Sequence, residues 1–203
     1  MKTHQINSSK AIIVSIGIVI TVLATLVIVG CTDKKTSEQN QASSDASQSN
    51  GQAPQVDIQT AVITGNIEAI KQHITAGSNL NEKDPFGGSS PLISAGVFGK
   101  PEIAKLLIDA GADINFQNND GSTALHTAAF FCHPEIVKML LDKGADKTIK
   151  NKYGATPYDS VVGPFGEVKP AYDMMGKILE PMGLKLDYNN IQKTRPVIAA
   201  MLK

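Results

Sequence analysis

The stretch that decides the fold is residues 121–146, GSTALHTAAFFCHPEIVKMLLDKGAD. Thirty-three residues earlier, residues 88–113 read GSSPLISAGVFGKPEIAKLLIDAGAD, with the same opening glycine, Pro-Glu-Ile run and closing Gly-Ala-Asp. A further copy of the opening begins at Gly154, again 33 residues on. Self-similarity at a fixed period indicates a repeat architecture in which each unit stacks on its neighbours.

The residue types in each copy suit a unit of two helices. Thr123 would cap the first helix by accepting backbone N–H bonds, and Pro91 would occupy a first turn, where its missing N–H costs nothing. Leu125 and its equivalents would point into the core between units. Gly111 and Gly144 would supply the left-handed conformation that ends the second helix. The apolar positions of 103–108 and 136–141 follow helical spacing and predict the stacking face.

This pattern resembles the ankyrin repeat, whose signature is a Thr-Pro-Leu-His-type helix start, a Gly between helices, a Leu-Leu pair and a Gly-Ala-Asp turn. The resemblance covers residues 55–187, and it reaches Lys203 if the tail counts as a cap. It implies an all-α ankyrin-repeat solenoid over residues 56–203, with about four helix-turn-helix repeats plus a C-terminal capping helix. It also implies a scaffold without catalysis of its own and without a cofactor.

The end units are irregular. Residues 57–81 are predicted to form a degenerate first unit without the Thr-Pro start, as expected of a capping repeat with one solvated face. Residues 154–187 are predicted to form a fourth unit. Within this unit we expect a helix start at Thr156 and Pro157, a loop over 163–170 and a helix over 171–179. A separate capping helix is expected to start at Thr194-Arg195-Pro196 and to run to Leu202.

The N-terminus carries an export signal. Residues 11–30 contain no charge and follow Lys2 and Lys10; such a run is long enough to span a bilayer and exceeds the apolar core of a simple signal peptide. Its end, Ile28-Val29-Gly30-Cys31, resembles the lipobox of bacterial lipoproteins, in which the Cys is lipidated and the preceding segment is removed. Residues 1–30 are therefore predicted to be a lipoprotein signal peptide, with an uncleaved signal anchor as the alternative.

Either alternative places residues 32–203 outside the cytoplasmic membrane, because the charge before the apolar segment is purely positive. By resemblance, Thr32 rather than Asp after Cys31 favours the outer membrane over the inner one. Residues 31–55 are rich in Ser, Gln, Asn and Asp, with three alanines as their apolar side chains up to Gln55. Such a stretch predicts a disordered tether that holds the folded part off the bilayer.

Charge and cysteine counts exclude other classes of protein. The chain has 19 basic and 19 acidic residues, and residues 32–203 lose two lysines and are slightly acidic. A dedicated nucleic-acid binder has a surplus of basic residues, so we do not expect this chain to bind nucleic acid. Two cysteines cannot build a disulfide framework. We expect a monomer.

His126, Cys132 and His133 form the one cluster with metal-binding chemistry. By the resemblance, however, His126 belongs to the helix start, where it hydrogen-bonds Thr123 and neighbouring loop backbone. Cys132 replaces the glycine between the helices, which strains that turn, and we expect it to be a small buried thiol. A metal or redox role and a nucleophilic role stay open as alternatives, and no metal site is predicted.

Partners of ankyrin proteins usually contact the loop tips and the exposed positions of the first helix. In this chain those positions are Phe86, Ser89, Val97, Phe98, Asn119, Asp120, Ser122, Phe130, Phe131, Lys152 and Tyr153. Four of the six Phe residues fall on this surface, and an exposed aromatic stripe is a binding-site hypothesis. The alternative is that Phe98 and Phe131 are tucked beneath neighbouring loops as part of the core.

These features together predict a lipid-anchored, periplasm-facing module that binds an unknown protein partner non-covalently through its concave face and loop tips. One alternative is an immunity-type or inhibitory factor for a single enzyme. The other is a metal- or redox-responsive protein that uses Cys132 with His126 or His133.

Overall fold

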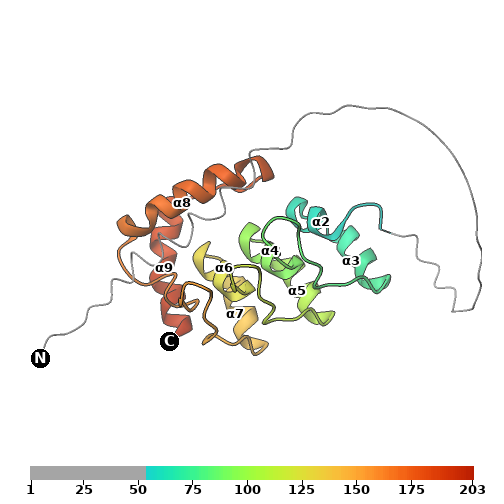
Figure 1. Cartoon of the computed structure of the whole chain (residues 1–203), viewed down its shortest axis with the longest axis horizontal. Helices are drawn as coiled ribbons and strands as arrows, with labels where there is room; N and C mark the ends of the chain where they lie inside the picture. The colour runs from blue at the N-terminus through green and yellow to red at the C-terminus, as the bar shows by residue number, and fades with distance from the viewer. Residues whose placement is uncertain (1–53) are drawn as a thin grey trace, which may run out of the picture.

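The computed structural model describes residues 54–203, which are helical and contain no strand (Figure 1). The elements are α2 (Ile58–Thr64), α3 (Ile67–Thr75), α4 (Pro91–Phe98), α5 (Pro101–Asp109), α6 (Ala124–Phe130), α7 (Pro134–Asp142), α8 (Phe165–Leu179), the 3-10 helix η2 (Glu180–Met182) and α9 (Tyr188–Leu202). Within 54–203, none of these helices is long and apolar enough to cross a bilayer. The predicted signal segment, and the predicted tether up to residue 53, lie outside the described residues.

The helices α2 to α7 form three stacked pairs (Figure 1). The first helices pack in the order α2, α4, α6, and the second helices pack in the order α3, α5, α7. Leu92 and Leu125, at equivalent positions of α4 and α6, are fully buried between units. Ile103 and Ile136 play the same part in α5 and α7. The predicted ankyrin-repeat solenoid is confirmed, and its core is a continuous layer rather than one per repeat.

Short local interactions set the helix ends of the regular repeats. The Ser90 hydroxyl accepts from the Ile93 N–H at the start of α4, and Pro91 follows as the first helical residue. Gly111 and Gly144 have φ of 89° and 83°. Because an L side chain is strained in that region, glycine is the residue that ends each repeat with a left-handed turn.

The fourth unit differs from the prediction. Residues 157–161 form a turn and not a helix, although the Asp159 carboxylate accepts from the N–H and hydroxyl of Thr156 as in a helix cap. The loop predicted over 163–170 is wrong beyond its first two residues, because α8 already begins at Phe165. Pro170 lies inside α8 and has no N–H to donate to the carbonyl four residues earlier. That carbonyl belongs to Gly166, which is exposed in the first turn of the helix.

The capping helix also starts earlier than predicted. The Asp187 carboxylate accepts from the N–H groups of Asn189 and Asn190, so α9 begins at Tyr188 and not at Thr194. Pro196 lies inside α9 on an exposed position. The predicted role of this helix is confirmed, since α9 packs against α7 and closes the end of the stack.

Candidate functional site

The loops that precede α4 and α6, and the equivalent loop before residue 157, have the same internal bracing. The Asp84 carboxylate accepts from the N–H of Phe86 at 2.8 Å. In the next repeat, the Asn118 side chain accepts from two N–H groups of its own loop, at 3.0 and 2.9 Å. Asn151 does the same one repeat later, with both contacts at 3.1 Å. Side chains of this type tie a tight turn to a single conformation.

Neighbouring loop tips are also bonded to one another. The Asn119 N–H donates to the Gly87 carbonyl at 2.9 Å, and the Lys152 N–H donates to the Asp120 carbonyl at 2.8 Å. The Tyr153 hydroxyl adds a bond to the Asp120 carboxylate at 3.2 Å. Residues 84–89, 118–122 and 151–155 therefore form one braced surface, which we call the loop-tip row.

The loop-tip row carries one large exposed apolar side chain. Phe86 is 74% exposed, whereas the equivalent side chains Asn119 and Lys152 are exposed and polar. The other predicted positions in the row are half-buried: Ser89, Asp120, Ser122 and Tyr153. Gly88 has φ of 66°, and a Cβ there would lie 2.4 Å from Oδ1 of the exposed Asn119 side chain, so a larger residue would be strained and would displace Asn119. Phe86 thus projects from a rigid support.

The predicted aromatic stripe on the first helices is only partly present. Val97 and Phe98 are half-buried at the end of α4. Phe131 is 6% exposed, so the second alternative, burial in the core, holds for this residue. The half-buried Phe130 ring meets Phe131 edge-on at 5.0 Å and stacks on Tyr172 of α8 at 4.5 Å. The C-terminal cap itself covers this end of the stripe.

The two histidines of the metal-binding cluster are occupied by structural hydrogen bonds. His126 Nδ1 accepts from the Thr123 N–H at 3.1 Å, and its Nε2 faces the Ala155 carbonyl at 3.1 Å. His133 Nε2 lies 3.3 Å from the Val97 carbonyl. Burial lowers the pKa of both imidazoles below the usual 6.5. The predicted contact between His126 and Thr123 is confirmed.

Cys132 lies in the turn between α6 and α7 with φ of 61°, the only positive φ outside glycine within residues 54–203. Its thiol is buried and faces the carbonyls of Phe130 and Ile191, each at 3.7 Å. Burial raises the pKa of this thiol to about 11. In the part of the chain that the structure describes, no group of three His, Cys, Asp or Glu side chains is placed to hold a metal ion.

A buried arginine at the C-terminal cap was not among the predicted site residues. Arg195 of α9 is 3% exposed, and it donates to the Ser160 and Val162 carbonyls at 3.0 and 3.3 Å and to the Tyr172 hydroxyl at 3.1 Å. The Tyr172 hydroxyl in turn donates to the Phe130 carbonyl at 2.6 Å. The sequence does show an arginine among apolar residues near the end of the chain. Its burial was not predicted, because Thr194-Arg195-Pro196 was interpreted as the start of a helix.

Comparison with known proteins agrees with the repeat fold. A family model described as ankyrin repeats (3 copies) matches residues 58–151. The human protein named protein phosphatase 1 regulatory subunit 27 is 39% identical over 61 residues, which is 30% of this chain and 39% of that protein. A putative ankyrin repeat protein of Rickettsia bellii is 44% identical over 61 residues, covering 28% of this chain and 8% of that protein.

Among solved structures, the ankyrin repeat domain of Bcl-3, described as a unique member of the IkappaB protein family, is similar with a TM-score of 0.50 and 29% identity. The match covers 57% of this chain and 50% of the Bcl-3 chain. The chain therefore spans half or less of the length of each of these relatives. Ankyrin repeats are typically scaffolds for protein interaction and not catalysts, and nothing in these matches points to catalysis.

Proposed function

We propose that the chain is a lipid-anchored, extracytoplasmic ankyrin-repeat module that binds a protein partner through its loop-tip row and the exposed positions of the first helices. The surface includes Phe86, Asn119 and Lys152 on the row, with Val97 and Phe98 at the other end of α4. The observation that carries the proposal is the exposure of Phe86 on a braced support. Burying one aromatic side chain removes about 150–250 Å² from water, and aromatic residues dominate interface energetics.

Rigidity of the row strengthens the proposal. Each loop is fixed by its own Asp or Asn side chain and by a bond to a neighbouring loop. A preorganised surface loses little conformational entropy on binding, so a small exposed patch can give useful affinity.

A photo-crosslinking amino acid tests the surface in the full chain within native membranes. It replaces Phe86 in one variant and Gln72 in the control, because Gln72 is an exposed position on α3 away from the row. We expect one crosslinked species specific to position 86, and we expect Phe98→Ala in the same chain to weaken it. Equal crosslinking at both positions would argue against the loop-tip row.

The anchor is proposed from the sequence, because Cys31 lies outside the described residues. Mass spectrometry of the membrane fraction is expected to find an acylated Cys31 at the mature N-terminus, and Cys31→Ser is expected to abolish acylation. An intact peptide that starts at Met1 would instead indicate the uncleaved signal anchor. Fractionation of the two membranes tests the outer-membrane location, and gel filtration in detergent tests the monomeric state.

A second candidate is an inhibitory or regulatory factor for one enzyme. It is supported by the similarity to a protein whose name marks it as a regulatory subunit of protein phosphatase 1. If the crosslinked species is an enzyme, adding the full chain is expected to change its activity, and Phe86→Ala is expected to reduce that change. An enzyme whose activity is unaffected would leave simple scaffolding as the function.

A further inference from the structure

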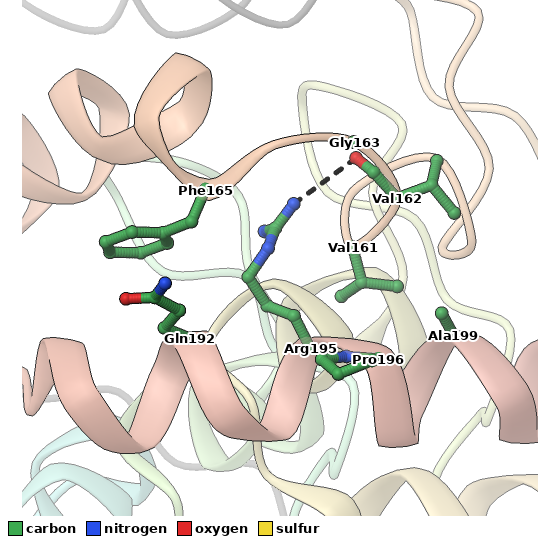
Figure 2. A pocket seen from close by; sticks show the side chains of 8 residues that line it. All are labelled: Val161, Val162, Gly163, Phe165, Gln192, Arg195, Pro196 and Ala199. Carbon is green, nitrogen blue, oxygen red and sulfur yellow. Dashed lines mark hydrogen bonds between the residues drawn. The ribbon is translucent and has the colours of Figure 1, made fainter.

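A cavity of about 320 Å³ lies between α9 and the chain that enters α8 (Figure 2). Its walls are apolar on most sides, and its polar groups are two side chains of α9, one turn apart. The apolar walls are Val161, Val162, Phe165 and Ala199, and the polar groups are Gln192 and Arg195. Ligand pockets of about 300–1,000 Å³ have this composition, with a few placed polar groups in an apolar lining, so this cavity suits a small ligand.

The cavity arises where the fourth unit departs from the repeat. The turn over 157–161 stands where the other units have a first helix, and Gly163, with φ of 91°, redirects the chain into α8. Backbone carbonyls at the end of this turn have no following helical turn to pair with. Arg195 pairs with two of them, those of Ser160 and Val162.

Arg195 carries a buried charge without a buried anion. Its hydrogen bonds go to two carbonyls and to the Tyr172 hydroxyl, all of them neutral acceptors. No ion pair among residues 54–203 includes this guanidinium. Taking a charge out of water is costly unless an opposite charge pairs with it. The site is therefore electrostatically suited to an anion.

Part of the guanidinium is still available for such an anion. Nη1 makes two of the three bonds and Nη2 makes one, so Nε and one N–H of Nη2 have no acceptor among the described residues. Every fully buried side-chain nitrogen and oxygen in that part of the chain has a partner, so Nε retains accessible surface. In Figure 2 the guanidinium lies between Phe165 and Val161, with the Gln192 amide on the same side of α9.

We propose that this cavity binds a small carboxylate with an apolar tail. The carboxylate would accept from Nε and Nη2 of Arg195, since arginine pairs with carboxylates through two parallel bonds. The Gln192 amide would donate to the same group, and the tail would pack against Phe165 and Ala199. Both a free short-chain acid and the C-terminus of a peptide offer this chemistry.

Saturation-transfer NMR on the full chain in detergent tests the proposal with matched probes. The first pair is 4-methylpentanoate and 4-methylpentanamide, which share a tail and differ in charge. The second pair is N-acetyl-Gly-Leu with a free carboxylate and the same peptide amidated. We expect half-saturation by an acid at about 1 mM, a weak affinity for so few atoms. Binding of its amide is expected to be about tenfold weaker. Binding by the free acid or by the peptide acid identifies the source.

Variants test whether the acid binds in this cavity. Ala199→Leu fills the cavity and leaves Arg195 in place, so it is expected to abolish the acid signal. Gln192→Ala is expected to weaken it, and Lys193→Ala, an exposed neighbour outside the lining, serves as the matched control. Arg195→Lys tests the two-bond geometry if circular dichroism shows that it folds. Equal binding of acid and amide, or binding that survives Ala199→Leu, would overturn the proposal.

Discussion

At the scale of single residues, Cys132 shows how a repeat tolerates a departure from its pattern. The equivalent turns of the first two units carry Gly65 and Gly99, with φ of 74° and 59°, and Cys132 adopts 61° in the same place. A non-glycine residue in this region costs about 1–3 kcal/mol. The buried thiol packs against α9 and offsets part of that cost, so the C-terminal cap compensates for a strained turn.

This strain predicts the order of two variants at one position. Cys132→Gly and Cys132→Ala both lose the thiol contacts, but only the glycine relieves the positive φ. We expect the free energy of unfolding of Cys132→Gly to exceed that of Cys132→Ala by about 1 kcal/mol. Urea unfolding measures both. As a control, the same glycine–alanine comparison at Ala128, inside α6, is expected to favour alanine. A more stable Cys132→Ala would contradict the strain.

The two buried histidines predict an acid-side loss of stability. Burial holds the pKa of His126 and His133 below the usual 6.5, so the unfolded chain binds their protons more tightly than the folded chain does. Their contribution to the free energy of unfolding is complete above about pH 6.5. It is lost as the pH falls from that value to below their pKa in the folded chain. Carboxyls such as Asp109 and Asp146, whose pKa is lowered below 3.8, titrate at a lower pH than this range.

Urea unfolding between pH 7.5 and 5 measures that loss. The variant His126→Gln with His133→Gln is expected to be less stable at pH 7.5, because it disturbs buried hydrogen bonds, but to show a flatter pH dependence. An unchanged slope in the variant would mean that other groups cause the loss.

At the scale of elements, the docking of α8 rests on Tyr172, which is fully buried and bonds both the Phe130 carbonyl and Arg195. Tyr172→Phe keeps the ring stack but leaves both partners without that hydroxyl. We expect a loss of about 1–3 kcal/mol in the free energy of unfolding. The matched control is Tyr158→Phe, a half-buried position at which a loss under about 0.5 kcal/mol is expected. Equal losses would show that α8 docks through its apolar contacts alone.

The middle repeats were predictable because each helix end has a local cause that the sequence displays. Ser90 followed by Pro91, and Gly111 after α5, act within a few residues of where they stand. The last two helices were not predictable in this way. Pro170 and Pro196 were interpreted as signals of a loop and a helix start, yet both lie inside helices at exposed positions, and α9 begins at the Asp187 cap instead.

The same contrast applies to the candidate site. The loop tips follow from repeat position, and the exposed Phe86 lies where the resemblance placed a contact. The environment of Phe130 depends on Tyr172, which lies 42 residues later and belongs to a helix that begins earlier than predicted. A long-range contact of that kind leaves no local pattern in a single sequence. The burial of Arg195 likewise depends on partners at least 23 residues earlier in the chain.

At the scale of the whole molecule, the chain is a stack in which each unit touches only its neighbours. The three helix pairs form a series in which α9 packs on α7 at one end, whereas α2 and α3 form the other end, with no further helix of residues 54–203 over them. Stability in such a stack is a sum of unit and interface contributions, so the two ends need not unfold together. The end closed by α8 and α9 has a buried polar network, and the α2–α3 end has fewer neighbours.

Hydrogen exchange on two cavity-forming variants is predicted to show this asymmetry. Ile58 in α2 and Leu125 in α6 are both buried, at 2% and 0% exposure, and each change to Ala removes about 2–5 kcal/mol of packing. Ile58→Ala is expected to speed exchange over 58–75 alone, because the end unit can open while its neighbours stay folded. Leu125→Ala is expected to speed exchange throughout 91–142 and in α9, since opening the middle unit breaks both of its interfaces. A uniform increase over 58–202 in both variants would show instead that the stack unfolds as one cooperative unit.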